Sequence, residues 1–360
     1  METVIYGAQS IALGTYKAIK TFFPAKNISC FLVTEKRNNP VELAGLPVKE
    51  LHEFARNMPQ EEKDDTEIMI ATPETVMDEI ENSLKTAGFC NLVRIDSRRW
   101  AQMQQLAFAR QGDYLPLSAF PLGVHRPSIQ VYRIRFFKDK VLRTNPVCPP
   151  YMIDLQVGAA QTDVIVAELR DNVADHISER NADYSELTGL YWIWKNRIVI
   201  DTKRREHYYG LAHYRRILEL SEDDLLRLRD NDIDVIFPYP MPYEPDIEEH
   251  HKRYLSEAEW KAVWQALEEL EPDYAEVFEH ILKNQHFYNY NIMIARGDVL
   301  ESYCSWLFPL LFRIEAIYNQ NKEKEPNRYI GYIGETLENL YFSYHRKELR
   351  IAHTGCRFFA

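Results

Sequence analysis

The first hundred residues alternate short apolar runs with amphipathic stretches. Apolar runs at 3–6, 28–35, 67–72 and 91–96 have the length of β-strands, and stretches with helical periodicity lie between them. A repeating order of strand and helix is typical of a parallel sheet covered by helices. We therefore predict that residues 1–100 form one α/β unit.

The pattern changes after residue 100. Residues 101–128 carry little periodicity and contain Pro116, Pro121 and Pro127, so we predict a linker there. Mixed signals for strands and helices then resume, which predicts a second α/β unit over 129–360. Its predicted strands lie at 129–137, 151–160, 234–240 and 289–295, and its predicted helices at 185–196 and 256–270.

Composition narrows the class of protein. A chain of 360 residues with 46% hydrophobic residues can bury a sizeable core, and its length favours two domains. The formal net charge of −11 argues against a nucleic-acid partner. Five cysteines without CxxC spacing indicate reduced thiols, and the longest apolar run, 306–312, is too short to span a bilayer. We expect a cytoplasmic protein without a signal peptide, with room for docking on the inner face of a membrane.

The first predicted strand leads into a partial nucleotide-binding fingerprint. Gly7, Gln9 and Ala12 occupy the three positions of G-x-G-x-x-G, and Glu35 ends the next strand. The middle glycine normally lets the backbone approach a pyrophosphate closely, and Gln9 replaces it here. The unit is therefore either a weak nucleotide pocket, with Glu35 on a ribose, or a degenerate Rossmann-like module that serves the structure alone.

The stretch YYGLAHYRRIL, residues 208–218, begins as a buried strand and then changes character. Its apolar residues end at Ala212, and His213, Arg215 and Arg216 follow within four positions. These basic groups either pair with the acidic segment 221–224 or bind an anionic ligand. The apolar lead-in favours the ligand, because arginine gives bidentate, charge-assisted contacts to phosphate.

Several long motifs resemble one bacterial polysaccharide-biosynthesis family, the glycosyltransferases of domain of unknown function 4422. They occur in the same order and cover roughly residues 150–345: LRDN, ISERNADYSELTGLYWIWKN, YYGLAHYRRIL, DVIFP, YNIMIARGDVLESYCSWLFPLLF and GYIGETLENLY. The resemblance implies a GT-A-like α/β domain that transfers a hexose, galactose as pyranose or furanose, from a UDP-sugar. The implied acceptor is a growing surface glycan or a lipid-linked glycan.

Many GT-A enzymes hold the donor diphosphate through a metal bound by Asp-x-Asp at the end of a core strand. In this chain the comparable strand end reads His213-Tyr214-Arg215-Arg216, so we predict that guanidinium groups replace the metal. The literal Asp232-Ile233-Asp234 precedes its strand and is interpreted as a turn. We expect no required cofactor, with Mn²⁺ or Mg²⁺ left open.

An inverting transferase needs a carboxylate beside the acceptor hydroxyl. Glu335, which follows two glycines and precedes a predicted helix, is the first candidate, and Asp163 and Asp171 come next. The alternative for Glu335 is charge complementarity at a helix N-terminus. Glu186 lies in an otherwise apolar helix and needs a partner, either a sugar hydroxyl or an arginine.

Polar side chains around the strand 289–295 complete the candidate donor site. His286, Asn289 and Asn291 have the hydrogen-bonding groups that sugar hydroxyls require, although a single histidine is more often a core residue. Two other functions stay open. One is a nucleotide-dependent oxidoreductase or epimerase that uses residues 1–100, and the other is a non-catalytic subunit that binds glycans through its aromatic residues.

Overall fold

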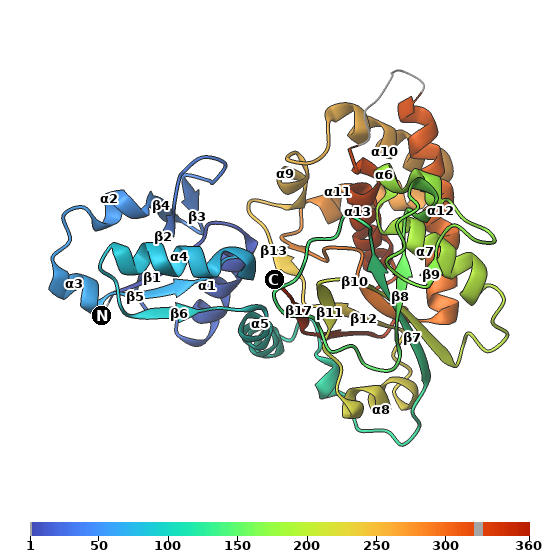
Figure 1. Cartoon of the computed structure of the whole chain (residues 1–360), viewed down its shortest axis with the longest axis horizontal. Helices are drawn as coiled ribbons and strands as arrows, with labels where there is room; N and C mark the ends of the chain where they lie inside the picture. The colour runs from blue at the N-terminus through green and yellow to red at the C-terminus, as the bar shows by residue number, and fades with distance from the viewer. Residues whose placement is uncertain (1, 320–326) are drawn as a thin grey trace.

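The computed structural model describes residues 2–319 and 327–360, which form two lobes side by side (Figure 1). The N-terminal lobe is a six-stranded sheet in the order β3-β4-β2-β1-β5-β6, parallel except for β3. Its strands are β1 (Thr3–Tyr6), β2 (Ile28–Val33), β3 (Glu42–Leu43), β4 (Leu46–Glu50), β5 (Glu67–Ile70) and β6 (Leu92–Arg94). Its helices are α1 (Ser10–Phe22), α2 (Leu51–Ala55), α3 (Gln60–Asp65), α4 (Glu74–Thr86) and α5 (Ser97–Gln111).

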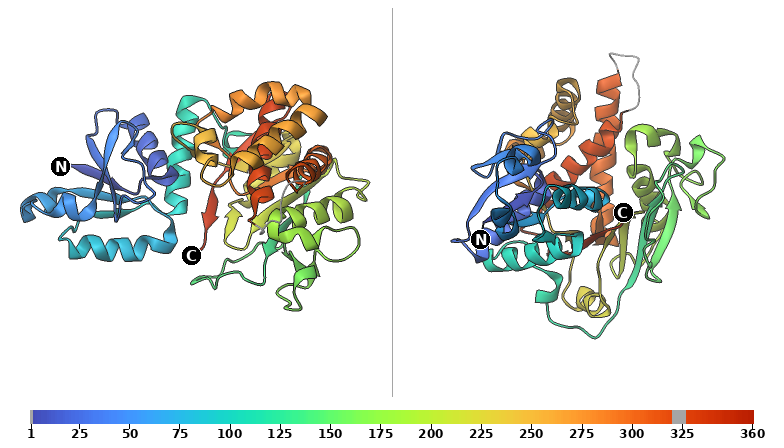
Figure 2. Two further views of the ribbon diagram at one scale, coloured as in Figure 1. Left: turned by 90° about the horizontal axis from the view of Figure 1, so that it is seen from above. Right: turned by 60° about the vertical axis from the view of Figure 1, so that its left-hand side comes forward.

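Helix α5 occupies part of the stretch 101–128 that was predicted as a linker. It lies between the two lobes (Figure 2). Its buried face carries the polar Gln104, whose side chain donates to the backbone oxygen of Gly14 in α1, and this polar residue hides the apolar period in the sequence. Residues 112–127 contain only a short 3-10 turn, Leu117–Ala119. A domain boundary between 100 and 130 stays a prediction.

The C-terminal lobe is built on a nine-stranded sheet whose main path is β16-β12-β15-β10-β7-β8-β9. Strands β10, β7, β8 and β9 run parallel, and β15 is inserted antiparallel between β10 and β12. This confirms the predicted α/β class with a GT-A-like arrangement. The strands are β7 (Ser128–Arg135), β8 (Met152–Gln156), β9 (Leu169–Arg170), β10 (His207–His213), β11 (Arg216–Leu218), β12 (Val235–Pro238), β15 (Met293–Arg296), β16 (Ile351–Thr354) and β17 (Cys356–Phe358).

Helices cover both faces of this sheet. They are α6 (Asn181–Tyr184), α7 (Leu187–Ile193), α8 (Glu222–Asp230), α9 (Ile247–His251), α10 (Glu257–Leu270), α11 (Pro272–Leu282), α12 (Gly297–Asn319) and α13 (Tyr329–Tyr344), with a small sheet of β13 (Met241–Pro242) and β14 (His286–Phe287) beside them. Successive residues of β10 serve opposite faces, as a strand requires. Tyr209 and Leu211 pack with the α7, α10, α12 and α13 side, whereas Tyr208 and Ala212 pack with the α8 side.

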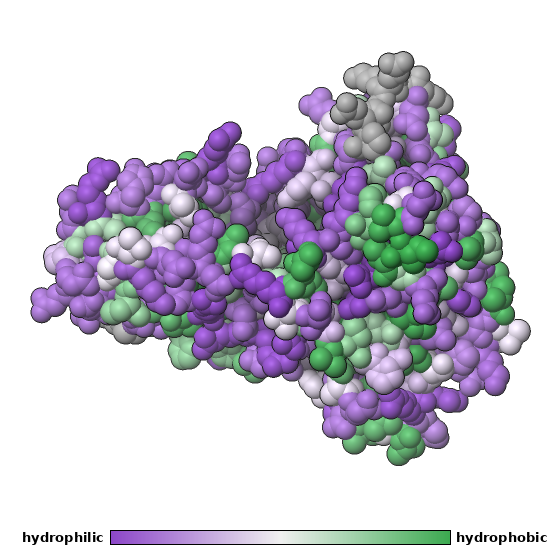
Figure 3. Space-filling view, viewed as in Figure 1, coloured by the Kyte–Doolittle hydropathy of each residue, from purple (hydrophilic) through white to green (hydrophobic). Residues whose placement is uncertain are grey.

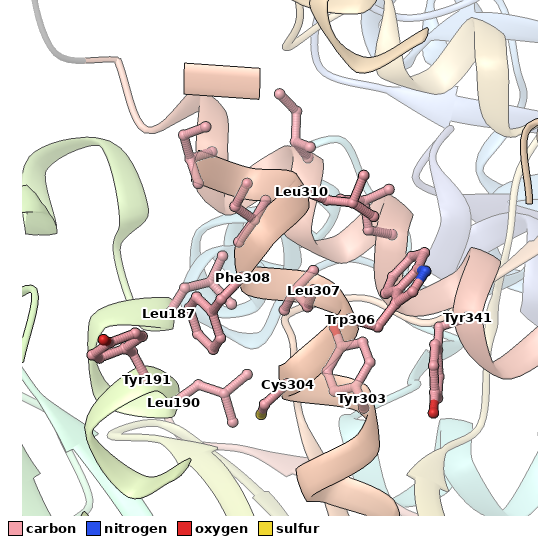
Figure 4. Packing of buried hydrophobic residues seen from close by; sticks show 14 of the residues in the cluster. Leu187, Leu190, Tyr191, Tyr303, Cys304, Trp306, Leu307, Phe308, Leu310 and Tyr341 are labelled. Atoms are coloured by element: carbon pink, nitrogen blue, oxygen red, sulfur yellow. The ribbon is translucent and has the colours of Figure 1, made fainter. Parts of the chain in front are cut away.

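The larger core is aromatic and is centred on α12 (Figure 4). Trp306 and Phe308 extend from α12 toward α13 and α7, where they meet Tyr341 and Tyr191. At the start of α10, Ser256 and Glu259 form a capping box. These contacts fix α7 and α13 over the carboxyl end of β10, where the candidate site lies.

Two glycines in α13 set how closely it approaches the α7 region. A Cβ atom built on Gly334 would lie 2.5 Å from Cδ1 of the fully buried Leu187, whereas one on Gly331 would lie 3.4 Å from Ser185. Only Gly334 is therefore required by the packing. Gly331 occupies a position where a methyl group fits.

We predict opposite effects of alanine at these two glycines. Gly331→Ala should leave the free energy of unfolding unchanged or raise it by up to about 1 kcal/mol, because alanine favours the helix. Gly334→Ala should lower it by about 1–3 kcal/mol, because Leu187 has no free space to move into. Urea unfolding of both variants measures this difference, and equal stabilities would show that close helix packing is not the role of Gly334.

Candidate functional site

The candidate site begins where β10 ends. His213 pairs with Arg216 across a tight hairpin, so Tyr214 and Arg215 form the turn and Arg216 starts β11. Strand β11 then pairs with β17. The hairpin thus presents both arginines at the carboxyl edge of the central strand, which is the edge where ligands bind in open α/β sheets.

Aromatic rings, rather than carboxylates, hold the two guanidinium groups. The Arg216 guanidinium lies 3.9 Å from the ring centre of Tyr290, and that of Arg215 lies 5.2 Å from the ring centre of Phe358. Within the described residues, no carboxylate lies within ion-pair distance of either guanidinium. The acidic segment 221–224 does not pair with them, because Asp224 caps α8 and contacts Arg227. Two cations therefore remain without an acidic partner in a chain of charge −11.

Tyr290 and Asn291 have an unusual backbone. Both adopt positive φ angles, 78° and 49°, which costs free energy for residues other than glycine and is common at functional sites. The turn directs the amide of Asn291 inward, where Nδ2 donates to Oε1 of Glu186 at 2.7 Å. Glu186 and Asn291 are therefore partners, whereas the sequence led us to expect a sugar hydroxyl or an arginine as the partner of Glu186.

Glu335 lies close to this pair but not at a helix N-terminus. Helix α13 begins at Tyr329, so Glu335 sits inside the helix, and the expected alternative of N-terminal charge complementarity is wrong. Burial, followed by the negative charge of Glu186, raises the pKa of Glu335 to about 8. A hydrogen bond with the Tyr290 backbone and the charges of Arg216 and Arg328 oppose this rise. Glu335 can thus gain or lose a proton near neutral pH.

His213 belongs to the same cluster but carries no charge at neutral pH. Burial, together with the positive charges of Arg216 and Arg328, lowers its pKa to about 4 against the opposing effect of Glu186. Its Nε2 atom is buried and has no hydrogen-bond partner in the described residues. His213 can therefore donate or accept a hydrogen bond, but it does not add a third cation to the two arginines.

Two residues of the cluster escaped the sequence analysis. Arg328 precedes α13 and donates from Nε to Oγ of Ser185, next to Glu186. Glu338 lies one turn after Glu335, is fully buried, and has a pKa raised well above the ordinary range by burial and by the charges of Glu335 and Glu186. The only signal for Glu338 was its spacing of three from Glu335, which places both carboxyls on one helix face.

The structure separates the other candidates from this cluster. Asp171 is fully buried and accepts four hydrogen bonds, two from the backbone at 158–159 and two from Ser178 and Thr188, so it is a structural residue and not a base. Asp163 lies exposed in the loop between β8 and β9. His286 lines a different cavity of about 520 Å³, where its ring packs on Tyr114 and burial lowers its pKa to about 4.

The Asp-x-Asp sequence lies away from the carboxyl edge, as predicted. Asp234 precedes β12 and forms an ion pair with Arg296 at 2.8 Å, while Asp232 adopts a positive φ angle in the turn. Among the described residues, one group of acidic and histidine side chains is close enough to hold a metal ion: Glu50, His52 and Glu53 in the N-terminal lobe. The end of β10 itself offers guanidinium groups, which cannot bind a cation.

The N-terminal fingerprint also forms a pocket. Gly7, Gln9 and Glu35 line a cavity of about 440 Å³ at the carboxyl ends of β1 and β2, and Ala12 is buried beneath it. Gly7 must be glycine, because its φ is +124° and a Cβ would lie 2.5 Å from the Ala71 oxygen. Gln9, however, accepts a hydrogen bond from Arg253 of the other lobe at 2.7 Å, so its side chain stands at the helix end where a pyrophosphate would bind.

The shifted pKa of Glu335 predicts a pH-dependent stability. Between pH 4.5 and 8 the folded state retains a proton that the unfolded state has lost, so the free energy of unfolding falls as pH rises. Glu335→Gln removes this effect. The free energy of unfolding of this variant, relative to that of the unmodified protein, should therefore rise by at least about 1 kcal/mol between pH 5 and pH 8. Chemical unfolding across this range is the measurement. Glu268→Gln, on the exposed side of α10, keeps Glu335 and should therefore show the same pH profile as the unmodified protein. Parallel pH profiles for all three proteins would contradict the raised pKa.

No helix in the described part of the chain is long and apolar enough to cross a membrane.

Comparison with known proteins identifies a similar solved structure. No curated protein matches the chain. Among solved structures, an apo structure described as the WbbM bifunctional glycosyltransferase matches with a TM-score of 0.55 and 23% identity. The match covers 64% of this chain but only 45% of that one, and it supports the GT-A-like fold.

The family comparison covers the lobe that carries the site. The model of the family described as "Domain of unknown function (DUF4422)" matches residues 142–347, which is more than half of the chain and includes the β10 hairpin, the Tyr290–Asn291 turn and α13. The chain therefore belongs to the DUF4422 family.

Proposed function

We propose that the protein is a glycosyltransferase that moves a hexose, of the galactose type, from a UDP-sugar to a growing surface polysaccharide or lipid-linked glycan. One observation carries the proposal: Arg215 and Arg216 have no acidic ion-pair partner among the described residues, and Arg216 lies near Glu335, whose pKa is raised to about 8 by burial. The likeness to a structure described as a glycosyltransferase supports the reaction class. The donor sugar and the acceptor rest on the family resemblance.

The arginine pair suits a leaving diphosphate. When the bond between the sugar and the diphosphate breaks, negative charge develops on the phosphate oxygens, and fixed cations in a partly desolvated site stabilise that charge. Tyr290 and Phe358 hold the guanidinium groups in place through their rings, so little reorganisation is needed. A nucleotide would otherwise be repelled by the net charge of −11.

The residues at this strand end do not fit a metal-bound diphosphate. Asp-x-Asp sites supply carboxylate oxygens to the ion. Here the corresponding positions hold His213 and the two arginines, and the nearest literal Asp-x-Asp is tied to Arg296. We therefore propose a transferase that works without Mn²⁺ or Mg²⁺.

Glu335 is the proposed general base. Its pKa of about 8 matches the proton affinity that a base needs in neutral solution, and the Tyr290 backbone holds it beside the arginine pair. The deprotonated carboxylate would take the proton of an acceptor hydroxyl as that oxygen attacks the anomeric carbon. Glu186, held by Asn291, would contact sugar hydroxyls and help to set the pKa of Glu335.

The expected setting is the cytoplasm, at the inner face of the membrane. The five cysteines are free, which fits a reducing compartment. Docking on the membrane would bring the site to a lipid-linked acceptor.

We predict that removing either arginine weakens donor binding and leaves the fold intact. Arg215→Ala and Arg216→Ala should each weaken UDP binding by roughly ten- to a hundredfold, because each removes one charge-assisted phosphate contact. Isothermal titration with UDP measures this effect. Arg126→Ala is the matched control, because Arg126 is exposed and pairs with Glu222. EDTA should leave most activity intact, and rescue by Mn²⁺ after complete loss in EDTA would contradict metal-free binding.

We predict that replacing the proposed base lowers turnover selectively. Glu335→Gln should lower the rate of sugar transfer by roughly 10²–10⁴-fold while UDP binding stays near the unmodified value. The rate of the unmodified enzyme should rise with pH toward a plateau above pH 8, and this rise should be absent in the variant. Normal transfer by Glu335→Gln would remove Glu335 from the mechanism. A protein that binds glycans but never releases UDP would be a binding subunit instead.

A further inference from the structure

The two lobes enclose a cavity that neither forms alone. Its volume is about 450 Å³. The N-terminal lobe contributes Trp100 of α5 and the segment 72–75 after β5, and the C-terminal lobe contributes the arginine pair with Tyr239, Asn289, Tyr290 and Phe358. The surface view shows the molecule hollowed between its lobes (Figure 3). The carboxyl ends of the N-terminal strands therefore face the end of β10.

The cavity opens directly on the proposed reaction centre. Arg215, Arg216 and Tyr290 line it, and the backbone of Tyr290 contacts Glu335. Apart from Lys140, its C-terminal wall comes from the turn between β10 and β11, from β11 itself, from β12 and the residue after it, from β13, from the turn before β15 and from β17. Strands β7, β8 and β9 lie on the side of β10 opposite to β15 and β12. In an open α/β sheet, nucleotides usually bind at the carboxyl ends of such parallel strands.

The lining has the chemistry of a saccharide site. Trp100, Tyr239, Tyr290 and Phe358 offer aromatic surface on which the C–H faces of a sugar ring can pack. Asn289 is 93% buried, since its exposed fraction is 7%, and its Nδ2 donates to Tyr243 while its Oδ1 has no partner in the described residues. The hydroxyl of Thr72, also in the cavity wall, likewise has no hydrogen-bond partner in the part of the chain that the structure describes. Buried acceptors without donors are costly, and sugar hydroxyls would supply those donors.

We propose that this cavity binds the saccharide end of the acceptor and that the N-terminal lobe acts as the acceptor wall. The inference rests on the proposed transferase function and adds the location and chemistry of its second substrate. It also gives the N-terminal lobe a role that does not require a nucleotide in its own pocket, where Gln9 is bonded to Arg253.

The test places a bulky residue on the N-terminal wall. Thr75 is exposed, lies in the first turn of α4 and lines the cavity, so Thr75→Trp should fill it without disturbing the C-terminal lobe. Val76→Trp is the matched control, because Val76 is the next residue and does not line the cavity. The acceptors are methyl β-galactopyranoside and methyl β-glucopyranoside, each compared with its octyl glycoside.

Three measurements separate the two substrates. We expect Thr75→Trp to raise the KM for the methyl glycosides about tenfold or more, corresponding to the loss of one stacked sugar face. UDP binding and the slow release of UDP from the donor without acceptor should match those of Val76→Trp. An unchanged acceptor KM would overturn the proposal. Weaker UDP binding in Thr75→Trp would overturn it as well, because the cavity would then hold the nucleotide.

If no sugar transfer is detected, a measurement of saccharide binding still tests the proposal. Saturation-transfer NMR should detect the methyl glycosides on the unmodified protein and on Val76→Trp, and the signal should be lost with Thr75→Trp. Equal signals in both variants would overturn the acceptor wall. Binding of the octyl glycosides alone would assign the cavity to a lipid chain and would also overturn the saccharide assignment. Absence of UDP release with intact saccharide binding would reject the transferase function and leave the sugar site standing.

Discussion

The enclosure of several carboxyl groups behind the end of β10 is the constraint on which the site depends. Glu186, Glu335 and Glu338 come from the segment before α7 and from α13, and Gly334 lets these helical segments approach closely. A carboxylate removed from water is unfavourable unless a partner or a proton neutralises it. Asn291 supplies a partner to Glu186, whereas the pKa values of Glu335 and Glu338 rise.

Tyr290 keeps the cations and the carboxyl of this site apart. Its ring takes the guanidinium of Arg216, and its backbone hydrogen-bonds to Glu335. A direct ion pair between Arg216 and Glu335 would neutralise both and would lower the pKa of the carboxyl below the range useful to a base. The positive φ angle of Tyr290 is therefore a local cost of a turn that places its ring against Arg216 and its backbone against Glu335.

The same turn also faces the N-terminal lobe. Tyr290 lines the cavity between the lobes and the pocket at the N-terminal fingerprint, and its hydroxyl contacts the sulfur of Met241. The N-terminal lobe has a six-stranded, mostly parallel sheet, and Gly7 at the end of β1 cannot be replaced without strain. Gln9 is bonded to Arg253, and residues after the carboxyl ends of the strands of this lobe line the cavity between the lobes.

The sequence by itself determined the α/β class and the strand that ends at His213, and it singled out Glu186, Asn291 and Glu335 as candidate site residues. These conclusions depend on local patterns, because an apolar run followed by arginines and a carboxylate inside an apolar stretch are visible without tertiary contacts. Only the tertiary structure decided the partners. Asn291 pairs with Glu186, and Asp171 accepts hydrogen bonds from several other segments. His286 lies in another cavity. These contacts involve residues that are far apart in the chain or in different elements. The neutral state of His213 and the raised pKa of Glu335 also come from burial, which depends on how the helices pack and cannot be read from residue order.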